Sequence, residues 1–147
     1  MRARRSPYAN RLKGKQRTRA IQASEYLTVD LDIFARRDLR PLVEALGDNV
    51  LVHFVGRRGG GRVAILGLAG PTESPTDAII RCSRVIDRLP VGARLLWKQA
   101  LRRIFNVGIQ AGDDRGTFEL AIENKALSAA ARHRAEIVVT VYGSGVR

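Results

Sequence analysis

The sequence has little that would support a disulfide, a membrane span or secretion. Its 147 residues include one cysteine, one methionine and one tryptophan, and aromatic residues make up 5% of the chain. Cys82 cannot form a disulfide within the chain, and its place on the apolar side of a predicted helix indicates a buried thiol. No apolar run approaches the roughly 20 residues that span a bilayer, and no apolar stretch follows the N-terminal charges. These absences predict a cytoplasmic protein that does not bind membranes.

Acidic residues are absent from the first 24 positions, although the whole chain has 14 of them. The formal net charge is +12, and arginine far outnumbers lysine. Residues 25–147 hold 18 cations against the 14 acids, so most of the excess charge lies before them. With few large apolar residues and with Pro7, Asn10 and Gly14 interrupting any helix, residues 1–24 are predicted to be a disordered basic arm. Its cations are Arg2, Arg4, Arg5, Arg11, Lys13, Lys15, Arg17 and Arg19.

The basic arm has three interpretations. Its charge can bind nucleic acid or another polyanion. It can also be a solvated tail without a partner. A third interpretation is an upstream extension of the reading frame, since Met1 is the only methionine and an internal start would need another codon.

The rest of the chain alternates between strand and helix patterns. Apolar residues alternate with polar ones over Tyr26–Phe34, which is typical of a strand with one buried face. Ser74 and Pro75 are typical of a helix start. The predicted order is a strand over 26–34, a helix over 38–46, strands over 50–55 and 63–68, helices over 74–89 and 91–104, strands over 105–111 and 118–122, a helix over 125–133 and a strand over 137–141.

Two stretches of the chain resemble each other. Thr28–Gly56 and Thr117–Gly143 both open with Thr, an apolar residue, an acid and Leu, continue into a short helical pattern and a β-branched run, and close on Gly. We therefore expect two related strand–helix–strand units of the ferredoxin-like kind. The predicted fold class is α+β, with a mixed, mostly antiparallel sheet and helices packed on one face. A single domain over 25–143 would be followed by a short tail over 144–147.

Residues with catalytic or metal-binding chemistry are present but do not form a recognisable set. Asp30 and Asp32 are a pair on the polar face of a strand, and His53 lies in the next strand without ligands at metal-site spacing. A smaller acidic cluster surrounds the predicted turn at 113–116. We find no nucleophile–base arrangement, and we therefore expect no enzyme activity, no metal and no cofactor.

Residues 56–62 read GRRGGGR and are predicted to turn one strand back into the next. The loop is cationic and rich in free backbone N–H groups, which is also compatible with a phosphate cradle. It lacks a Gly-Lys-Ser/Thr ending and a helix directly after it, so it does not match the nucleotide-binding loop. A mobile hairpin tip is the simpler interpretation.

Two predicted helices carry regularly spaced cations on their outer faces. Such stripes are typical of a solvated helix face, and they can also bind an acidic protein or a phosphate backbone. Trp97 lies in the apolar stripe of the second helix and is predicted to be part of the core. The six cations are Arg81, Arg84, Arg88, Arg94, Lys98 and Arg102.

The last third of the chain carries a family resemblance. It contains a strand of the type F-x-hydrophobic-G-hydrophobic at 105–109, a Leu-x-Ile segment with a short helix at 120–131, and a β-branched strand ending in Tyr142. These features resemble a family of small bacterial proteins of unknown function, some of which look like immunity proteins of contact-dependent toxin systems. The resemblance is best over 90–143 and implies an α+β domain with no established activity, so it transfers no functional residue.

These observations predict a non-enzymatic interaction module, immunity-like, that binds an acidic protein partner through the six helix cations. The alternative is a nucleic-acid or ribosome-associated protein that uses the basic arm. The sequence leaves the oligomeric state open.

Overall fold

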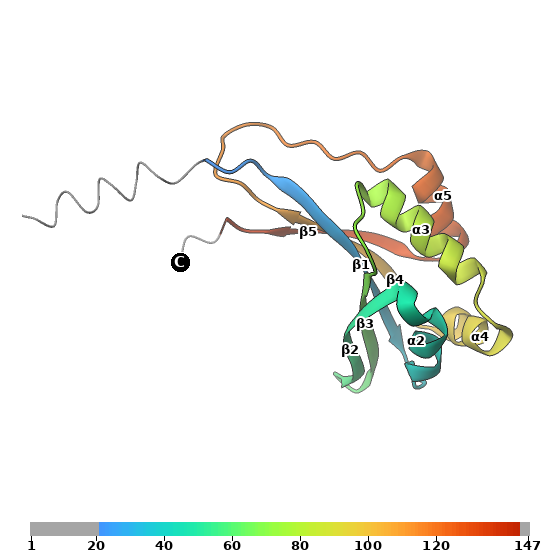
Figure 1. Ribbon diagram of the computed structural model, residues 1–147. Coiled ribbons are helices and arrows are strands. Elements are labelled where there is room, and N and C mark those ends of the chain that lie inside the picture. The colour runs from blue at the N-terminus through green and yellow to red at the C-terminus, as the bar shows by residue number, and fades with distance from the viewer. Residues whose placement is uncertain (1–20, 145–147) are drawn as a thin grey trace, which may run out of the picture.

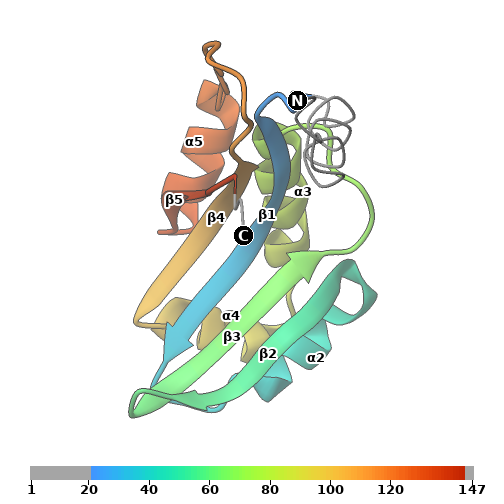
Figure 2. The ribbon, with the colours of Figure 1, turned by 90° about the vertical axis from the view of Figure 1, so that its left-hand side faces the viewer.

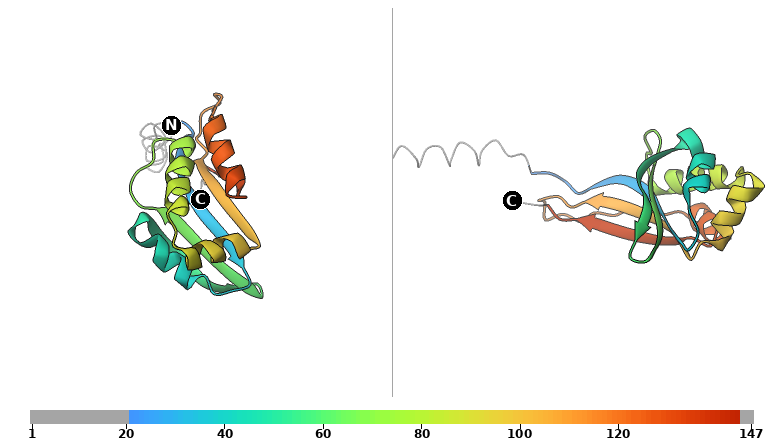
Figure 3. Two further views of the ribbon diagram at one scale, coloured as in Figure 1. Left: turned by 90° about the vertical axis from the view of Figure 1, so that its right-hand side faces the viewer. Right: turned by 90° about the horizontal axis from the view of Figure 1, so that it is seen from below.

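The computed structural model describes residues 21–144, which form one five-stranded sheet with helices on one of its faces (Figure 1). Figure 2 looks onto the face without helices, and the left view of Figure 3 looks onto the helical face. The strands are β1 (Glu25–Ala35), β2 (Val50–Arg58), β3 (Gly61–Leu68), β4 (Arg102–Gln110) and β5 (Glu136–Tyr142). The helices are α2 (Arg40–Leu46), α3 (Pro75–Asp87), α4 (Val91–Gln99) and α5 (Asn124–Arg132), with a short 3-10 turn, η1, over Gly47–Asn49.

The sheet order is β2-β3-β1-β4-β5. β1 lies in the middle and pairs antiparallel with both β3 and β4, β2 pairs antiparallel with β3, and β4 pairs parallel with β5. The predicted fold class is therefore confirmed: a mixed, mostly antiparallel sheet covered by helices on one side. Its other face is left to solvent.

Alternation along β1 determines which face is covered. Val29, Leu31 and Ile33 are at most 1% exposed and pack under the helices, together with Phe105 of β4. Asp30 and Asp32 point to the open face, as the period of two requires. The core therefore lies between the centre of the sheet and the inner faces of the helices.

The longest of the described helices, α3, begins as predicted. The Ser74 side chain accepts a hydrogen bond from the backbone N–H of Asp77 at 3.1 Å, and Pro75 occupies the first helical position. Ile79, Cys82 and Ile86 form its buried face, which confirms the predicted buried thiol. Burial raises the pKa of the Cys82 thiol to about 12, so it stays protonated and unreactive at neutral pH.

The predicted second strand–helix–strand unit is wrong in its first element. Residues 117–123 form no strand, so the second unit consists only of α5 and β5. The edge of β4 that this strand could join is already paired with β5 over Ile104–Gln110. The segment instead runs outside the sheet from the end of β4 to α5 (Figure 1), where Leu120 and Ile122 pack partly against the core.

The helix predicted over 91–104 ends five residues early. α4 stops at Gln99, Ala100 is extended, and Leu101 donates its backbone N–H to the carbonyl of Phe34 at 2.7 Å. From Arg102 onward the chain forms strand β4 and pairs with β1. Leu101, which a helix continued to residue 104 would turn inward with Trp97, is consequently 60% exposed.

The predicted arm over 1–24 lies largely outside the described residues, as do 145–147 of the predicted tail. The last residues of the arm, 21–24, are described, and they run beside the turn after β4. Gln22 accepts a hydrogen bond from the backbone of Asp113 at 2.8 Å, and Ser24 accepts one from Gly112 at 2.9 Å. A Cβ atom on Gly112 would lie 2.2 Å from the Gln22 carbonyl oxygen, so only glycine permits this approach.

Candidate anion-binding cavities

The six helix cations predicted to bind a partner do not form one surface. Arg81 donates to the backbone carbonyls of Ala69 and Pro71 at 3.2 and 2.7 Å, and it also contacts Asp77. Arg102 lies on β4 rather than on a helix, and it pairs with Glu136 at 2.7 Å. Both side chains are therefore already engaged within the protein, and the predicted stripe through Arg102 is wrong because the chain has left the helix by that point.

The remaining four predicted cations divide into two pairs. Arg84 on α3 and Arg88 at its C-terminal cap are exposed, and neither side chain forms a hydrogen bond or an ion pair within residues 21–144. Arg94 and Lys98 lie on α4 and line a cavity of about 500 Å³ against α3 and the end of α5. We call this the helical cavity.

The helical cavity is strongly cationic. Its wall carries five arginine or lysine side chains and a single acid, so its formal net charge is +4 with His133 neutral. Ile86 and Trp97 contribute apolar side chains to the lining of the cavity. The charged residues are Arg94, Lys98, Arg103, Arg132, Arg134 and Asp87.

Arg103 is the most buried of these cations, at 8% exposed. Its guanidinium donates to the carbonyls of Trp97 and Ala100 at 2.7 and 3.1 Å and to that of Arg134 at 3.2 Å. Burial lowers the pKa of Arg103, and the neighbouring charge of Arg134 lowers it further. Arg103 thus closes the C-terminal end of α4 and fixes the turn after α5.

Arg132 and Arg94 are also held by the protein. Arg132 binds both carboxylate oxygens of Asp87, at 2.5 and 3.1 Å, and donates to the Ser83 hydroxyl at 2.9 Å. The hydrogen bond from Arg132 holds the pKa of Asp87 below its usual value. Arg94 donates to the Asp87 carbonyl at 2.7 Å.

Lys98 and Arg134 are different from the other three cations. Neither side chain forms a hydrogen bond or an ion pair in the described part of the chain, and both residues are exposed. Arg134 also has a backbone φ of 54°, in the left-handed region that favours glycine. These two side chains are therefore available to a ligand.

His133 lies between the three helices and is nearly buried, with 10% of its side chain exposed. Its Nε2 atom lies 2.9 Å from the Ser83 hydroxyl and 3.2 Å from Asp87, and its ring meets Trp97 edge-on at 6.0 Å. Burial lowers the pKa of His133, with a further contribution from Arg132. The imidazole is consequently neutral at pH 7, and its protonation at lower pH adds a positive charge to the helical cavity.

Two helix ends oppose the charge of the helical cavity. The C-terminal carbonyls of α4 and the turn after α5 meet at Arg103, and each helix end carries roughly half a negative charge. Together they offset about one of the four net positive charges. The cavity therefore remains attractive to an anion.

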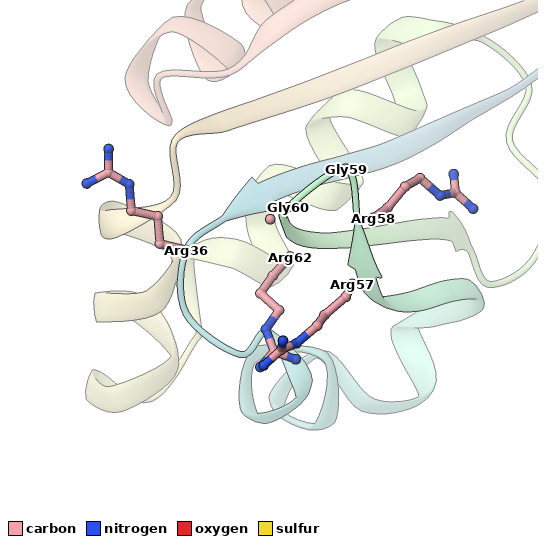
Figure 4. Close-up of a pocket in the computed structure, with 7 residues that line it drawn as sticks. Arg36, Arg57, Arg58, Gly59, Gly60 and Arg62 are labelled. Carbon is pink, nitrogen blue, oxygen red and sulfur yellow. The ribbon is translucent and has the colours of Figure 1, made fainter.

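A second cationic cavity lies at the tip of the β2–β3 hairpin (Figure 4). It has a volume of about 360 Å³ and is lined by Arg36, Arg57, Arg58 and Arg62 around three glycines. The predicted hairpin over 56–62 is confirmed, with the turn at Gly59 and Gly60, whose φ values are 59° and 80°. We call this the hairpin cavity.

The predicted acidic pair, Asp30 and Asp32, lies on the open face of the sheet. Each has one buried carboxylate oxygen without a hydrogen-bond partner, and burial raises the pKa of both. His53 approaches Asp30 at 3.8 Å. Within residues 21–144, no three His, Cys, Asp or Glu side chains lie close enough together to hold a metal ion.

No family model matches this chain, and neither does any curated protein or solved structure. The resemblance to immunity-like proteins over residues 90–143 therefore stays a prediction, and function has to be argued from the cavities. Among the described helices, none is long and apolar enough to cross a membrane.

Sequence reasoning missed three cations of the helical cavity, Arg103, Arg132 and Arg134. The signal for two of them was present, since an Arg-His-Arg run at the end of a helical pattern is typical of residues that serve the last carbonyls. No such pattern points to Arg103, because the sequence predicts a helix over residues 91–104. Its carbonyl partners become visible only when β4 is in place.

Proposed function

We propose that this protein is a non-enzymatic binding module that receives an acidic side chain of a protein partner in the helical cavity. The proposal is supported by two cations, Lys98 and Arg134, whose side chains have no partner within the described residues. They belong to a cavity wall with a formal net charge of +4. A carboxylate between them forms two charge-assisted hydrogen bonds, which are the strong ones in protein recognition.

The fixed cations give this site a permanent positive potential. Arg103 and Arg132 are already oriented by carbonyls and by Asp87, so the wall needs no reorganisation when an anion enters. Trp97 and Ile86 add an apolar surface against which the methylene groups of a glutamate side chain can pack. The module acts by binding, and we assign no reaction to it.

The experiment uses a fluorescently labelled oligoglutamate peptide as the probe and measures its anisotropy with the full chain. We expect the double variant K98Q/R134Q to weaken binding about tenfold, because exposed ion pairs contribute roughly 0.2–1 kcal/mol each and two of them about 1.4 kcal/mol. The matched control is R115Q/K125Q, which removes two exposed cations that line neither cavity.

Two results would contradict this proposal. One is an equal loss of affinity in K98Q/R134Q and in the control, which indicates attraction by overall charge alone. The other is a larger loss in R84Q/R88Q, which places the partner on the outer side of α3.

The alternative function, nucleic-acid or ribosome binding through the basic arm, also stays a prediction. All eight cations of the arm lie outside the described residues. Deleting residues 1–24 should then abolish retention on DNA or RNA at low salt and flatten the dependence of affinity on salt concentration.

A further inference from the structure

The hairpin cavity contains two arginines that face each other directly. Arg57 of β2 and Arg62 of β3 are partners in the antiparallel ladder, so both side chains leave the hairpin on the same face. Figure 4 draws their guanidinium groups together on the side of α2, whereas Arg58 leaves on the opposite face and Arg36 points away. Directly paired residues have Cβ atoms roughly 5 Å apart, and like charges at that spacing repel.

Nothing in residues 21–144 compensates this repulsion. The hairpin cavity is lined by four arginines and three glycines, with no acid. Within residues 21–144, none of these four arginines forms a hydrogen bond to a side chain or an ion pair. Arg57 and Arg62 thus hold two positive charges in place without an acceptor.

The glycines leave room for a ligand at this tip. A Cβ atom at Gly59 or Gly60 would meet no other atom within 4 Å, and both residues have positive φ, which side chains rarely adopt. The tip therefore presents bare backbone, which an extended ligand can approach closely. Among the residues that line the hairpin cavity, only the arginines can contact such a ligand with a side chain.

A backbone phosphate fits this arrangement. Its two non-bridging oxygens can each accept hydrogen bonds from one guanidinium fork, as the two oxygens of a carboxylate also can, so Arg57 and Arg62 by themselves select an anion. Arg58 adds a second feature, because its guanidinium lies 4.2 Å from the centre of the Phe54 ring. A planar cation fixed on an aromatic ring in this way is a surface on which a nucleic-acid base can stack.

We infer that the β2–β3 hairpin is a nucleic-acid contact site, in which Arg57 and Arg62 bind one backbone phosphate and the Arg58–Phe54 stack receives a neighbouring base. This inference is independent of the function proposed for the helical cavity. It is also independent of the basic arm, because the hairpin meets β1 at Ala35 whereas the arm precedes its other end at Glu25.

The test measures binding of a fluorescently labelled single-stranded oligothymidylate to the full chain over a series of salt concentrations. We expect R57Q/R62Q to weaken binding about tenfold at roughly 50 mM salt. The slope of log affinity against log salt should fall by about 0.7, which is the value for one lost phosphate contact on a single strand. R57K/R62K keeps the charge and loses the fork geometry, so we expect an intermediate loss of affinity with an unchanged slope.

The control R115Q/K125Q should change the affinity for oligothymidylate less than R57Q/R62Q does. A direct readout is the Nε–H resonances of Arg57 and Arg62 in NMR spectra, which should shift when the oligonucleotide is added. Circular dichroism checks that each variant is folded, and R57K/R62K keeps the test valid if the Gln variant is not.

Three outcomes would overturn the inference. One is equal weakening by R57Q/R62Q and the control, with no shift of the two arginine resonances. Another is binding of oligoglutamate at this hairpin as tightly as oligothymidylate, which assigns the site to an acidic protein. The third is R57Q/R62Q-sensitive binding to phosphatidylglycerol vesicles without binding to the oligonucleotide, which assigns it to a membrane surface.

Discussion

The helical cavity and the hairpin cavity carry the same formal net charge, +4, but their arginines differ in the hydrogen bonds that they form. In the helical cavity, three of the five cations already donate to carbonyls, to Ser83 or to Asp87. In the hairpin cavity, no arginine has such an acceptor within the described residues. Charge alone therefore says little about a basic surface, and the acceptors that each guanidinium already has indicate which cations hold the fold and which are left for a ligand.

The largest expected effect that would test this comparison comes from Arg103. The variant R103M removes the side-chain donor from the carbonyls of Trp97, Ala100 and Arg134, so we expect the free energy of unfolding to fall by about 3 kcal/mol, measured by urea denaturation. R103K keeps the charge but cannot reach all the carbonyls, and it should lose less. A loss below about 1 kcal/mol for R103M contradicts the structural role of this arginine.

The next effect is the pH dependence that His133 gives the helical cavity. Its pKa is lowered in the folded protein, so the unfolded chain binds more protons below about pH 6.5 and stability falls as the pH drops through this range. One proton accounts for at most about 1.4 kcal/mol per pH unit. Ser83 and Asp87 of α3, Trp97 of α4 and Arg132 surround the imidazole.

The variant H133Q should remove this part of the pH dependence in thermal melts between pH 7 and 5. Asp87 does not produce the same signal, since its pKa is lowered and its contribution is lost only at more acidic pH. In the wild type, oligoglutamate binding should strengthen as the pH is lowered through the range in which His133 becomes protonated, because the imidazolium adds a charge to the helical cavity. An unchanged pH profile in H133Q would show that another group titrates.

Arg134 separates stability from binding. Its N–H donates to the Ala131 carbonyl and the next N–H, of Ala135, donates to the Ala130 carbonyl, so Arg134 occupies the left-handed position of a Schellman motif that glycine prefers. We expect R134G to raise the free energy of unfolding by about 0.5 kcal/mol and to weaken oligoglutamate binding. A variant that is both more stable and binds as well as the wild type contradicts the role of Arg134 in the cavity.

The smallest effect is expected at the hairpin. Replacing one of two facing arginines removes their repulsion, so R57Q should raise the free energy of unfolding by a few tenths of a kcal/mol in the absence of ligand. The gain should disappear at high salt, which screens exposed charges. Destabilisation by R57Q at low salt would mean that Arg57 has a partner in the fold, and the contrast with Arg103 would be lost.

Local patterns predicted the elements whose partners are simple. Alternation located β1 and its two faces, and Ser74 with Pro75 located the start of α3, because these signals act within a few residues. The pattern at 117–122 is as regular as that of β1, yet it forms no strand, since a strand also needs an unoccupied neighbour and β5 takes the place beside β4.

The cavities were less accessible to sequence reasoning than the strands. The spacing of Arg94, Lys98 and Arg102 fits one helix face, and the first two do line the helical cavity. Arg102 does not, because pairing with β1 overrides the helical pattern. Asp87, Lys98 and Arg134 come together only through the packing of three helices, which no periodicity within one segment reports.

The two carboxylates at the centre of the open sheet face restrict which molecular surfaces can pack against that face. Asp30 and Asp32 each keep an oxygen that is shielded from water and lacks a donor. An aliphatic surface laid over them would also remove the still exposed part of each carboxylate from water, at a cost of several kcal/mol. A neighbour that donates hydrogen bonds to these carboxylates, from an amine, an amide or a hydroxyl, avoids this cost, so β1 disfavours apolar contacts on the open face without a bulky side chain.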